Sequence, residues 1–178
     1  RRERSMFRFR ISRGNFALVW VQSKGLGMPR YSAWTMQSSN AWTGFAAMLK
    51  EQTGVDACFQ RPGGFNLSMS TREFEARTSL LERLQSQPGM TRFEYEMLDG
   101  SAVRQALPGV GPEVVGASYS RFDGHCNSLR LFRALHTGMQ QFGVRYLPEH
   151  RVTHIEHKHG EFHLTTTKGE VRAAKIVL

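Results

Sequence analysis

The sequence predicts an α/β or α+β protein that contains two kinds of sheet. Segments with helical periodicity alternate with short strand-like segments along the 178 residues. The closing run, Lys175–Leu178, has the apolar character of a strand inside a covered parallel sheet. Segment 93–97 instead alternates apolar and charged side chains, which is typical of a half-exposed antiparallel sheet. We therefore expect one parallel sheet and one antiparallel sheet.

The first third of the chain predicts a short strand and a long helix. Phe16–Val21 is an apolar run that ends at the glycine- and proline-containing segment 25–29. From Tyr31 to about Lys50, large apolar residues recur at spacings of three and four, and Gly54 is a suitable helix stop. The expected buried face carries Tyr31, Trp34, Ala41, Trp42, Phe45, Met48 and Leu49.

The middle of the chain predicts two strand–helix pairs. The first is a proline-interrupted bent strand or strand pair over 57–69, followed by a helix that Ser70 or Thr71 caps. The buried side of this helix is expected to carry Phe74, Leu80, Leu81 and Leu84. The second pair is the strand 93–97 and a short helix capped by Asp99.

The last third predicts a strand over 114–122, a turn at Asp123-Gly124 and an amphipathic helix capped by Asn127 or Ser128. Gly143 closes this helix. Its inward face is expected to carry Leu129, Phe132, Leu135, Met139 and Phe142. Further strands are expected over 144–147, 151–156, 162–167 and 171–174, with a hairpin turn at Lys168-Gly169.

Composition indicates a soluble, cytoplasmic protein. Hydrophobic residues make up 40% of the chain and charged residues 22%. No apolar run approaches the roughly 20 residues that a helix needs to span a bilayer, and no signal-peptide pattern is visible. Two cysteines, Cys58 and Cys126, are too few for a disulfide framework and predict reduced thiols.

Positive charge gathers at the N-terminus. The net charge is +9, and the first 13 residues hold six arginines against one glutamate. A basic arm of this kind can bind nucleic acid. The rest of the chain lacks a basic stripe with interleaved aromatic residues, so nucleic acid is not the expected partner.

Tests for metal and catalytic motifs exclude several site classes. His154, His157, His159 and His163 are close in sequence, but no Cys or Asp joins them, and alternation on a strand points His154 and His157 to opposite faces, so no metal site is predicted. No catalytic triad or dinucleotide loop is visible. Four polar residues alternate with apolar ones on two strands and predict either a substrate cavity or a solvated face. They are Asn66, Ser68, Ser118 and Ser120.

Five strings follow one another along the chain. They are Ser12-Arg13-Gly14-Asn15-Phe16-Ala17-Leu18, Phe59–Phe65, Gly116–His125, Arg151–Ile155 and Gly169–Leu178. In this order they resemble the D-amino-acid oxidase superfamily of FAD-dependent oxidoreductases. The resemblance points to its group of glycine oxidases, sarcosine oxidases and D-hydroxyproline or opine dehydrogenases, and it covers residues 12–178.

The resemblance implies FAD as cofactor and oxidation of an amino acid or secondary amine by hydride transfer to the flavin. It assigns no catalytic side chain, because the flavin carries the chemistry. The expected cofactor-binding residues are Ser12, Arg13, Asn15, Ala17 and Leu18 beside the flavin and Val152 beside the adenine. The expected partner is a small-molecule amino acid or amine, and a second subunit or an oligomer stays open.

The resemblance also implies domain boundaries. Residues 1–11 form a basic arm, 12–56 a partial Rossmann-like FAD-binding domain, 57–122 an antiparallel-sheet substrate-binding domain, and 123–178 the FAD-binding domain continued. The family's G-x-G-x-x-G loop does not precede Ser12, and Ala17 stands where the family has glycine. We therefore expect an internal, truncated piece that is inactive as the isolated chain.

Two other functions stay open on sequence grounds. One is a non-catalytic module that binds or assembles by pairing exposed sheet edges with another chain. The other is a nucleic-acid binder that uses the basic arm, whose binding would weaken with salt.

Overall fold

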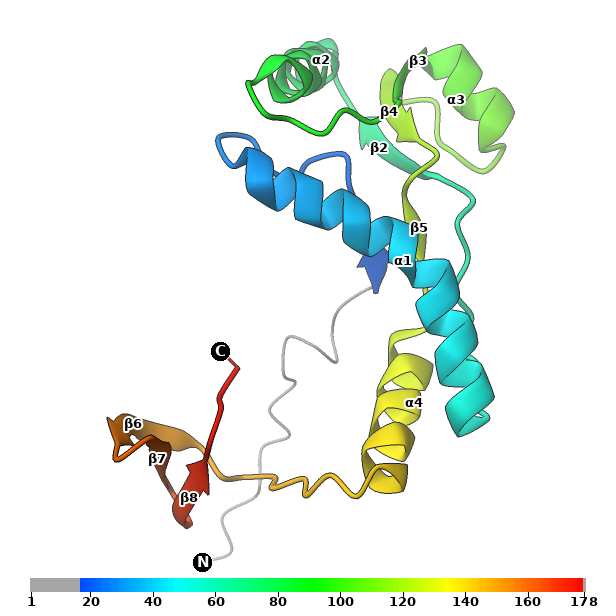
Figure 1. The fold of residues 1–178 in the computed structure, drawn as a ribbon. Coiled ribbons are helices and arrows are strands. Elements are labelled where there is room, and N and C mark those ends of the chain that lie inside the picture. The colour runs from blue at the N-terminus through cyan, green and yellow to red at the C-terminus, as the bar shows by residue number, and fades with distance from the viewer. Residues whose placement is uncertain (1–16, 178) are drawn as a thin grey trace, which may run out of the picture. The chain divides into compact units, whose positions relative to one another are not determined.

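A computed structural model describes residues 17–177 of the chain (Figure 1). The chain divides into two compact units, Arg1–Gly138 and Met139–Leu178, and each is described by itself. Helices and strands are mixed, and every strand pair among the described residues is antiparallel. The α+β fold class is therefore confirmed, whereas the expected parallel sheet is not formed within the described residues.

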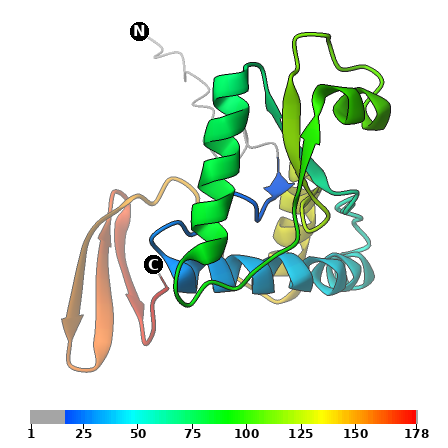
Figure 2. The same cartoon turned by 90° about the horizontal axis from the view of Figure 1, so that it is seen from above.

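The first unit holds two small sheets and four helices in its described part. Its elements are β1 (Leu18–Val19), α1 (Pro29–Thr53), β2 (Gly64–Ser68), α2 (Thr71–Ser86), β3 (Glu96–Asp99), α3 (Gly100–Ala106), β4 (Gly116–Ser120), β5 (Gly124–His125) and α4 (Ser128–Gln141), whose last residues pass into the second unit. One sheet has the order β2-β4-β3 and the other pairs β1 with β5. Helix α2 packs against β2 and β4, as Figure 2 shows.

Helix α1 ends where the sequence predicts, but it buries a different face. Gly54 adopts a φ of 70° and closes the helix, in agreement with its predicted role. Ser32, Met36 and Ser39 are buried, whereas Trp34 is 65% exposed. The prediction of the buried face is confirmed at Leu49 and wrong in the first half of the helix, where small serines let the helix approach its neighbours closely. The Ser39 hydroxyl, for example, donates to the Phe122 carbonyl at 2.8 Å.

Helix α2 begins with a reciprocal cap. The backbone N–H of Glu73 donates to the Ser70 hydroxyl at 3.2 Å, and Glu73 Oε2 accepts from the backbone N–H of Met69 at 2.7 Å. Ser70 is thus the cap, and Thr71 is the first helical residue. Leu81 and Leu84 are buried as predicted and form a core with Val21, Met36 and Phe93.

Three local predictions in the first unit are confirmed and one is wrong. Asp99 caps α3 by accepting from the backbone N–H of Ala102 at 2.9 Å. Asn127 caps α4 by accepting from the backbone N–H of Arg130 at 3.0 Å. Strand β4 lies within the predicted range 114–122. The predicted turn at Asp123-Gly124 is wrong, because Gly124 begins β5 and pairs with Val19.

Helix α4 does not bury the face that its periodicity predicts. Within the described residues Ala134 is its buried residue, whereas Leu129 is 61% exposed and Phe142, directly after the helix, is 71% exposed. An amphipathic pattern shows which side of a helix is apolar, but burial also needs a packing partner.

The second unit is a three-stranded antiparallel meander. It contains β6 (Val152–Lys158), β7 (Glu161–Thr166) and β8 (Gly169–Ala173) in the order β6-β7-β8, as predicted. The predicted strands 144–147 and 175–178 are not formed in the described residues, and Val177 is 99% exposed. A strand needs a neighbour to pair its backbone groups, and no described strand pairs with either segment.

Candidate functional site

A buried polar network fixes the segment after β1 to α2 and β4. Arg77 donates through Nε to the Ser118 hydroxyl at 2.8 Å and through NH2 to the Gln22 backbone carbonyl and Oε1, both at 2.8 Å. Its NH1 donates to the Ser23 hydroxyl at 2.7 Å. Gln22 and Ser118 are each 0% exposed. Each of the three guanidinium nitrogens of Arg77 is therefore bonded within the fold.

Asp123 completes this network from the opposite side of Gln22. Its carboxylate accepts from the Val21 backbone N–H at 2.5 Å and from Gln22 Nε2 at 2.7 Å. Burial raises the pKa of the Asp123 carboxyl above its usual value, while these hydrogen bonds and the charge of Arg77 oppose the rise. Burial also lowers the pKa of Arg77. Gln22 thus links a buried cation to a buried carboxyl group.

A cavity of about 550 Å³ opens beside this network. It is lined by Leu18, Trp20, Lys24, Phe65 and Asn66. Leu18 is 54% exposed, although its neighbour Val19 is buried, because alternate residues of β1 face opposite sides. The Trp20 ring packs directly against β2, since a Cβ on Gly64 would collide with it. The cavity therefore has aromatic and aliphatic walls with one amide and one ammonium group.

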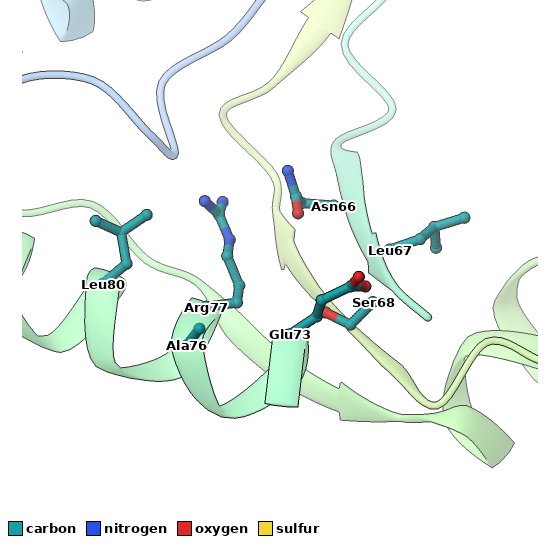
Figure 3. A pocket seen from close by; sticks show the side chains of 7 residues that line it. All are labelled: Asn66, Leu67, Ser68, Glu73, Ala76, Arg77 and Leu80. Carbon is teal, nitrogen blue, oxygen red and sulfur yellow. The ribbon is translucent and has the colours of Figure 1, made fainter. Parts of the chain in front are cut away.

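A second hollow of about 350 Å³ lies between β2 and α2. Figure 3 shows Arg77 and Leu80 extending from α2 on the side to which Asn66 of β2 also points, whereas Leu67 points away from the helix. Asn66 lines this hollow as well as the cavity beside β1. It is the polar residue of β2 that faces both spaces.

The four polar strand residues do not act as one set. Ser68, Ser118 and Ser120 are buried, with exposures of 2%, 0% and 1%. Ser118 donates to Gln22 Oε1 at 2.5 Å, and Ser120 donates to the Glu94 carbonyl at 3.0 Å. Neither a solvated face nor a substrate-lining role describes Ser118 and Ser120, because their hydroxyls are used inside the fold. Asn66 and Ser68 do line a cavity, as one of the two alternatives predicted.

The structure describes three of the six predicted cofactor-binding residues. Ser12, Arg13 and Asn15 lie outside the described residues. Leu18 lines the cavity beside β1, and Ala17 directly precedes it. Val152 begins β6 in the second unit and is 45% exposed. Trp20 and Lys24 were not predicted as site residues. The strand signal at 16–21 could have indicated Trp20, since it lies two residues beyond Leu18 and thus on the same side.

Metal clusters and membrane-spanning helices are both absent from the described part of the chain. No group of three or more His, Cys, Asp or Glu side chains lies close enough together to hold a metal ion within residues 17–177. Among the helices of the same part of the chain, none has the length and apolar character to cross a membrane.

The sequence matches the family model of the FAD dependent oxidoreductases (DAO) over residues 3–178. The chain belongs to this family. A subunit of opine oxidase from Agrobacterium tumefaciens (strain Ach5) is 40% identical over 169 residues, which are 95% of this chain and 46% of that protein. The corresponding opine oxidase subunit of Rhizobium meliloti is 38% identical over 147 residues, or 83% of this chain and 40% of that protein. The chain thus spans less than half the length of these relatives.

Solved structures agree with the assignment at the level of the fold. Glycine oxidase from Geobacillus kaustophilus superposes with a TM-score of 0.77 at 20% identity, over 92% of this chain and 43% of that one. Glycine oxidase from Bacillus cereus ATCC 14579 superposes with a TM-score of 0.72 at 22% identity, over 90% and 42%. The predicted superfamily and its cofactor, FAD, are confirmed for the family to which this chain belongs.

The residues around the cavity suit one side of a flavin. A flavin presents a flat aromatic face, and Leu18, Trp20 and Phe65 supply apolar surface for one side of it. The backbone also fits the family pattern. Ala17, where the sequence resemblance leads us to expect glycine, adopts a φ of 54°, in the left-handed region that favours glycine.

Replacing Ala17 by glycine is expected to raise the free energy of unfolding by about 0.5–1 kcal/mol. The left-handed conformation costs an alanine about 1–2 kcal/mol, of which the greater freedom of glycine in the unfolded chain cancels a part. Urea unfolding followed by circular dichroism measures the change. The matched control is Ala57→Gly, at a fully buried alanine outside the left-handed region, which should destabilise the chain. A loss of stability in Ala17→Gly would show that the backbone at residue 17 is not strained.

Proposed function

We propose that this chain is part of an FAD-dependent enzyme that oxidises an amino acid or a secondary amine to an imine, which water then hydrolyses. In this proposal Ser12, Arg13, Asn15, Ala17 and Leu18 lie beside the flavin, and Val152 lies beside the adenine. Residues 57–122 form the substrate-binding domain, flanked by the FAD-binding segments 12–56 and 123–178. The isolated chain is proposed to be inactive, because it spans less than half of its relatives.

One observation carries the proposal. Leu18 belongs to the strand that the family resemblance puts beside the flavin, and Phe65 and Asn66 belong to the strand that it puts in the substrate-binding domain. These residues line the same cavity of about 550 Å³. A substrate amine bound against β2 would therefore lie next to a flavin bound against β1.

The chain's own residues would orient the reactants and exclude water. When bound, FAD supplies the hydride acceptor. Leu18 and Trp20 would cover one side of the reacting centre with apolar surface, which keeps water from it. Asn66 can donate from its amide to a carboxylate or accept from a protonated amine. The buried network of Arg77, Gln22 and Asp123 supports this geometry by fixing the segment between Val21 and Ser23.

The relatives support two finer proposals. Both are named as subunits of an opine oxidase, so we propose an opine-like secondary amine as substrate and at least one further polypeptide as partner. A cytoplasmic setting is proposed as well, supported by Cys58 and Cys126, which are both free. A role in nucleic-acid binding would depend on residues 1–11, which lie outside the described residues.

The test is a chimera in which this chain replaces the matching segment of the Agrobacterium relative, produced with the other subunits of that opine oxidase. The purified chimera is mixed anaerobically with N-(1-carboxyethyl)alanine, a simple opine, while the flavin absorbance is recorded. The proposal expects bleaching of the oxidised flavin bands and formation of a keto acid. A chimera that binds FAD but is not reduced by this opine or by any other amino acid or secondary amine would contradict the proposal.

A further inference from the structure

Lys24 is a positioned cation without a counter-charge in the described part of the chain. Its side chain lines the cavity beside β1 and is half-buried. None of the hydrogen bonds or ion pairs among residues 17–177 involves its ammonium group. The cavity lining contains no aspartate or glutamate. A half-buried ammonium group in such a place favours an anionic ligand.

The backbone around Lys24 is held in place rather than free to move. The Gln87 side chain clamps the next turn, donating to the Gly25 carbonyl at 2.7 Å and accepting from the Gly27 N–H at 2.8 Å. Gly25 has a φ of 90°, and a Cβ there would lie 2.5 Å from the Cβ of Ser32. On the N-terminal side of Lys24, the Ser23 hydroxyl accepts a hydrogen bond from Arg77. The ammonium group is thus presented to the cavity from a fixed segment.

Arg77 is the other cation near these cavities, but it does not line the cavity beside β1. All three of its guanidinium nitrogens donate to Ser118, Ser23 or Gln22 within the fold. Lys24 therefore carries the positive charge that a ligand in the cavity beside β1 can use. Asn66, in the same lining, adds an amide donor that can bind a second oxygen of one carboxylate.

We infer that Lys24 binds a second carboxylate of the substrate, so that the enzyme prefers secondary amines with a carboxylate on both sides of the nitrogen. This inference rests on the proposed function and deepens it. Opines of the N-(carboxyalkyl)amino acid type have a carboxylate on both sides of the nitrogen. A cavity of about 550 Å³ has room for one of these two carboxylate-bearing groups. Lys24 then acts as a specificity-determining residue, and the oxidised carbon–nitrogen bond lies elsewhere in the substrate.

The test compares two amines that differ by one carboxylate. N-(1-carboxyethyl)alanine has two carboxylates, and N-ethylalanine has one with otherwise the same carbon skeleton around the nitrogen. Anaerobic flavin reduction in the chimera gives the half-saturating concentration and the limiting rate for each. Dissociation constants for glutarate and butyrate, which cannot be oxidised as amines, are measured from the perturbation of flavin absorbance.

Lys24→Met is expected to raise the half-saturating concentration of N-(1-carboxyethyl)alanine by about 10- to 100-fold, the usual effect of losing a charged hydrogen bond. The values for N-ethylalanine, the limiting rates and the FAD content should stay the same. Glutarate should bind more weakly, whereas the binding of butyrate should not change. Lys24→Arg should restore part of the preference for the dicarboxylate amine. Lys50→Met removes an exposed lysine that is paired with Asp56, and it should leave the half-saturating concentration of both amines unchanged.

Two results would overturn the inference in different ways. If Lys24→Met leaves both amines unchanged, or weakens both equally, Lys24 does not bind the second carboxylate, while the proposed function stands. If no amine reduces the flavin in either the unmodified chimera or the variant, the proposed function fails, and the inference fails with it.

Discussion

Replacing Arg77 by methionine is expected to lower the free energy of unfolding by about 3–5 kcal/mol, because several buried acceptors lose their donor and a buried carboxyl group loses the positive charge that offsets its burial. Methionine keeps the apolar stem but removes every guanidinium donor. Gln22 and Ser118, both 0% exposed, then lose the hydrogen bonds from the guanidinium, and Asp123 loses the positive charge that offsets its burial. Urea or thermal unfolding of the purified protein measures the loss.

The control for this prediction lies on the same helix. Arg83→Met removes an exposed arginine from the last turn of α2 and should change stability by no more than about 0.5 kcal/mol. If Arg77→Met and Arg83→Met had the same small effect, the network around Gln22 would not be what joins α2 to β4.

Replacing Leu18 by aspartate is expected to reduce the FAD content of the chimera at least about tenfold. The change puts a carboxylate on the apolar wall of the cavity, where burial against a bound ring system would cost several kcal/mol. Leu18 is 54% exposed in the chain, so folding should tolerate the substitution. Flavin absorbance relative to protein absorbance after purification gives the content.

Leu26→Asp is the matched control, since Leu26 is also partly exposed, at 36%, and does not line the cavity. It should leave the FAD content unchanged. Unchanged FAD in Leu18→Asp, with a normal unfolding curve, would remove Leu18 from the cofactor site and would leave β1 without an assigned role.

Local signals in the sequence predicted element types well where a short-range rule applies. Asp99, Asn127 and Ser70 cap helices because their side-chain oxygens reach backbone N–H groups three residues ahead. Gly54 closes α1 for an equally local reason, its left-handed backbone. The meander β6-β7-β8 followed from its period and its turns.

Buried faces were harder to predict because they depend on distant partners. Nothing local shows that Ser32 and Ser39 of α1 are buried while Trp34 is exposed. The face of α4 is apolar as predicted, yet Leu129 and Phe142 are mostly exposed. The strand 175–178 was predicted from its apolar character, but pairing needs a neighbour, which a residue pattern cannot supply.

The candidate site was predicted only in part for the same reason. Leu18 was found through the family resemblance, and Asn66 through its place on an alternating strand. No sequence pattern marked Lys24 as a site residue, since a single lysine after a strand is common in proteins of every function. Its importance depends on Arg77, which is more than 50 residues away and is already bonded within the fold. Gln22 and Asp123, about 100 residues apart, meet for reasons of tertiary structure as well.

The most direct test of the central claim, that this chain forms the flavin-facing wall of an FAD-dependent oxidoreductase, is an FAD titration. The isolated chain and the chimera are each titrated while flavin fluorescence and visible absorbance are recorded. We expect the chimera to bind stoichiometric FAD and the isolated chain to bind it weakly or not at all. A chimera that folds, as judged by a cooperative unfolding transition, but binds no FAD would contradict the claim.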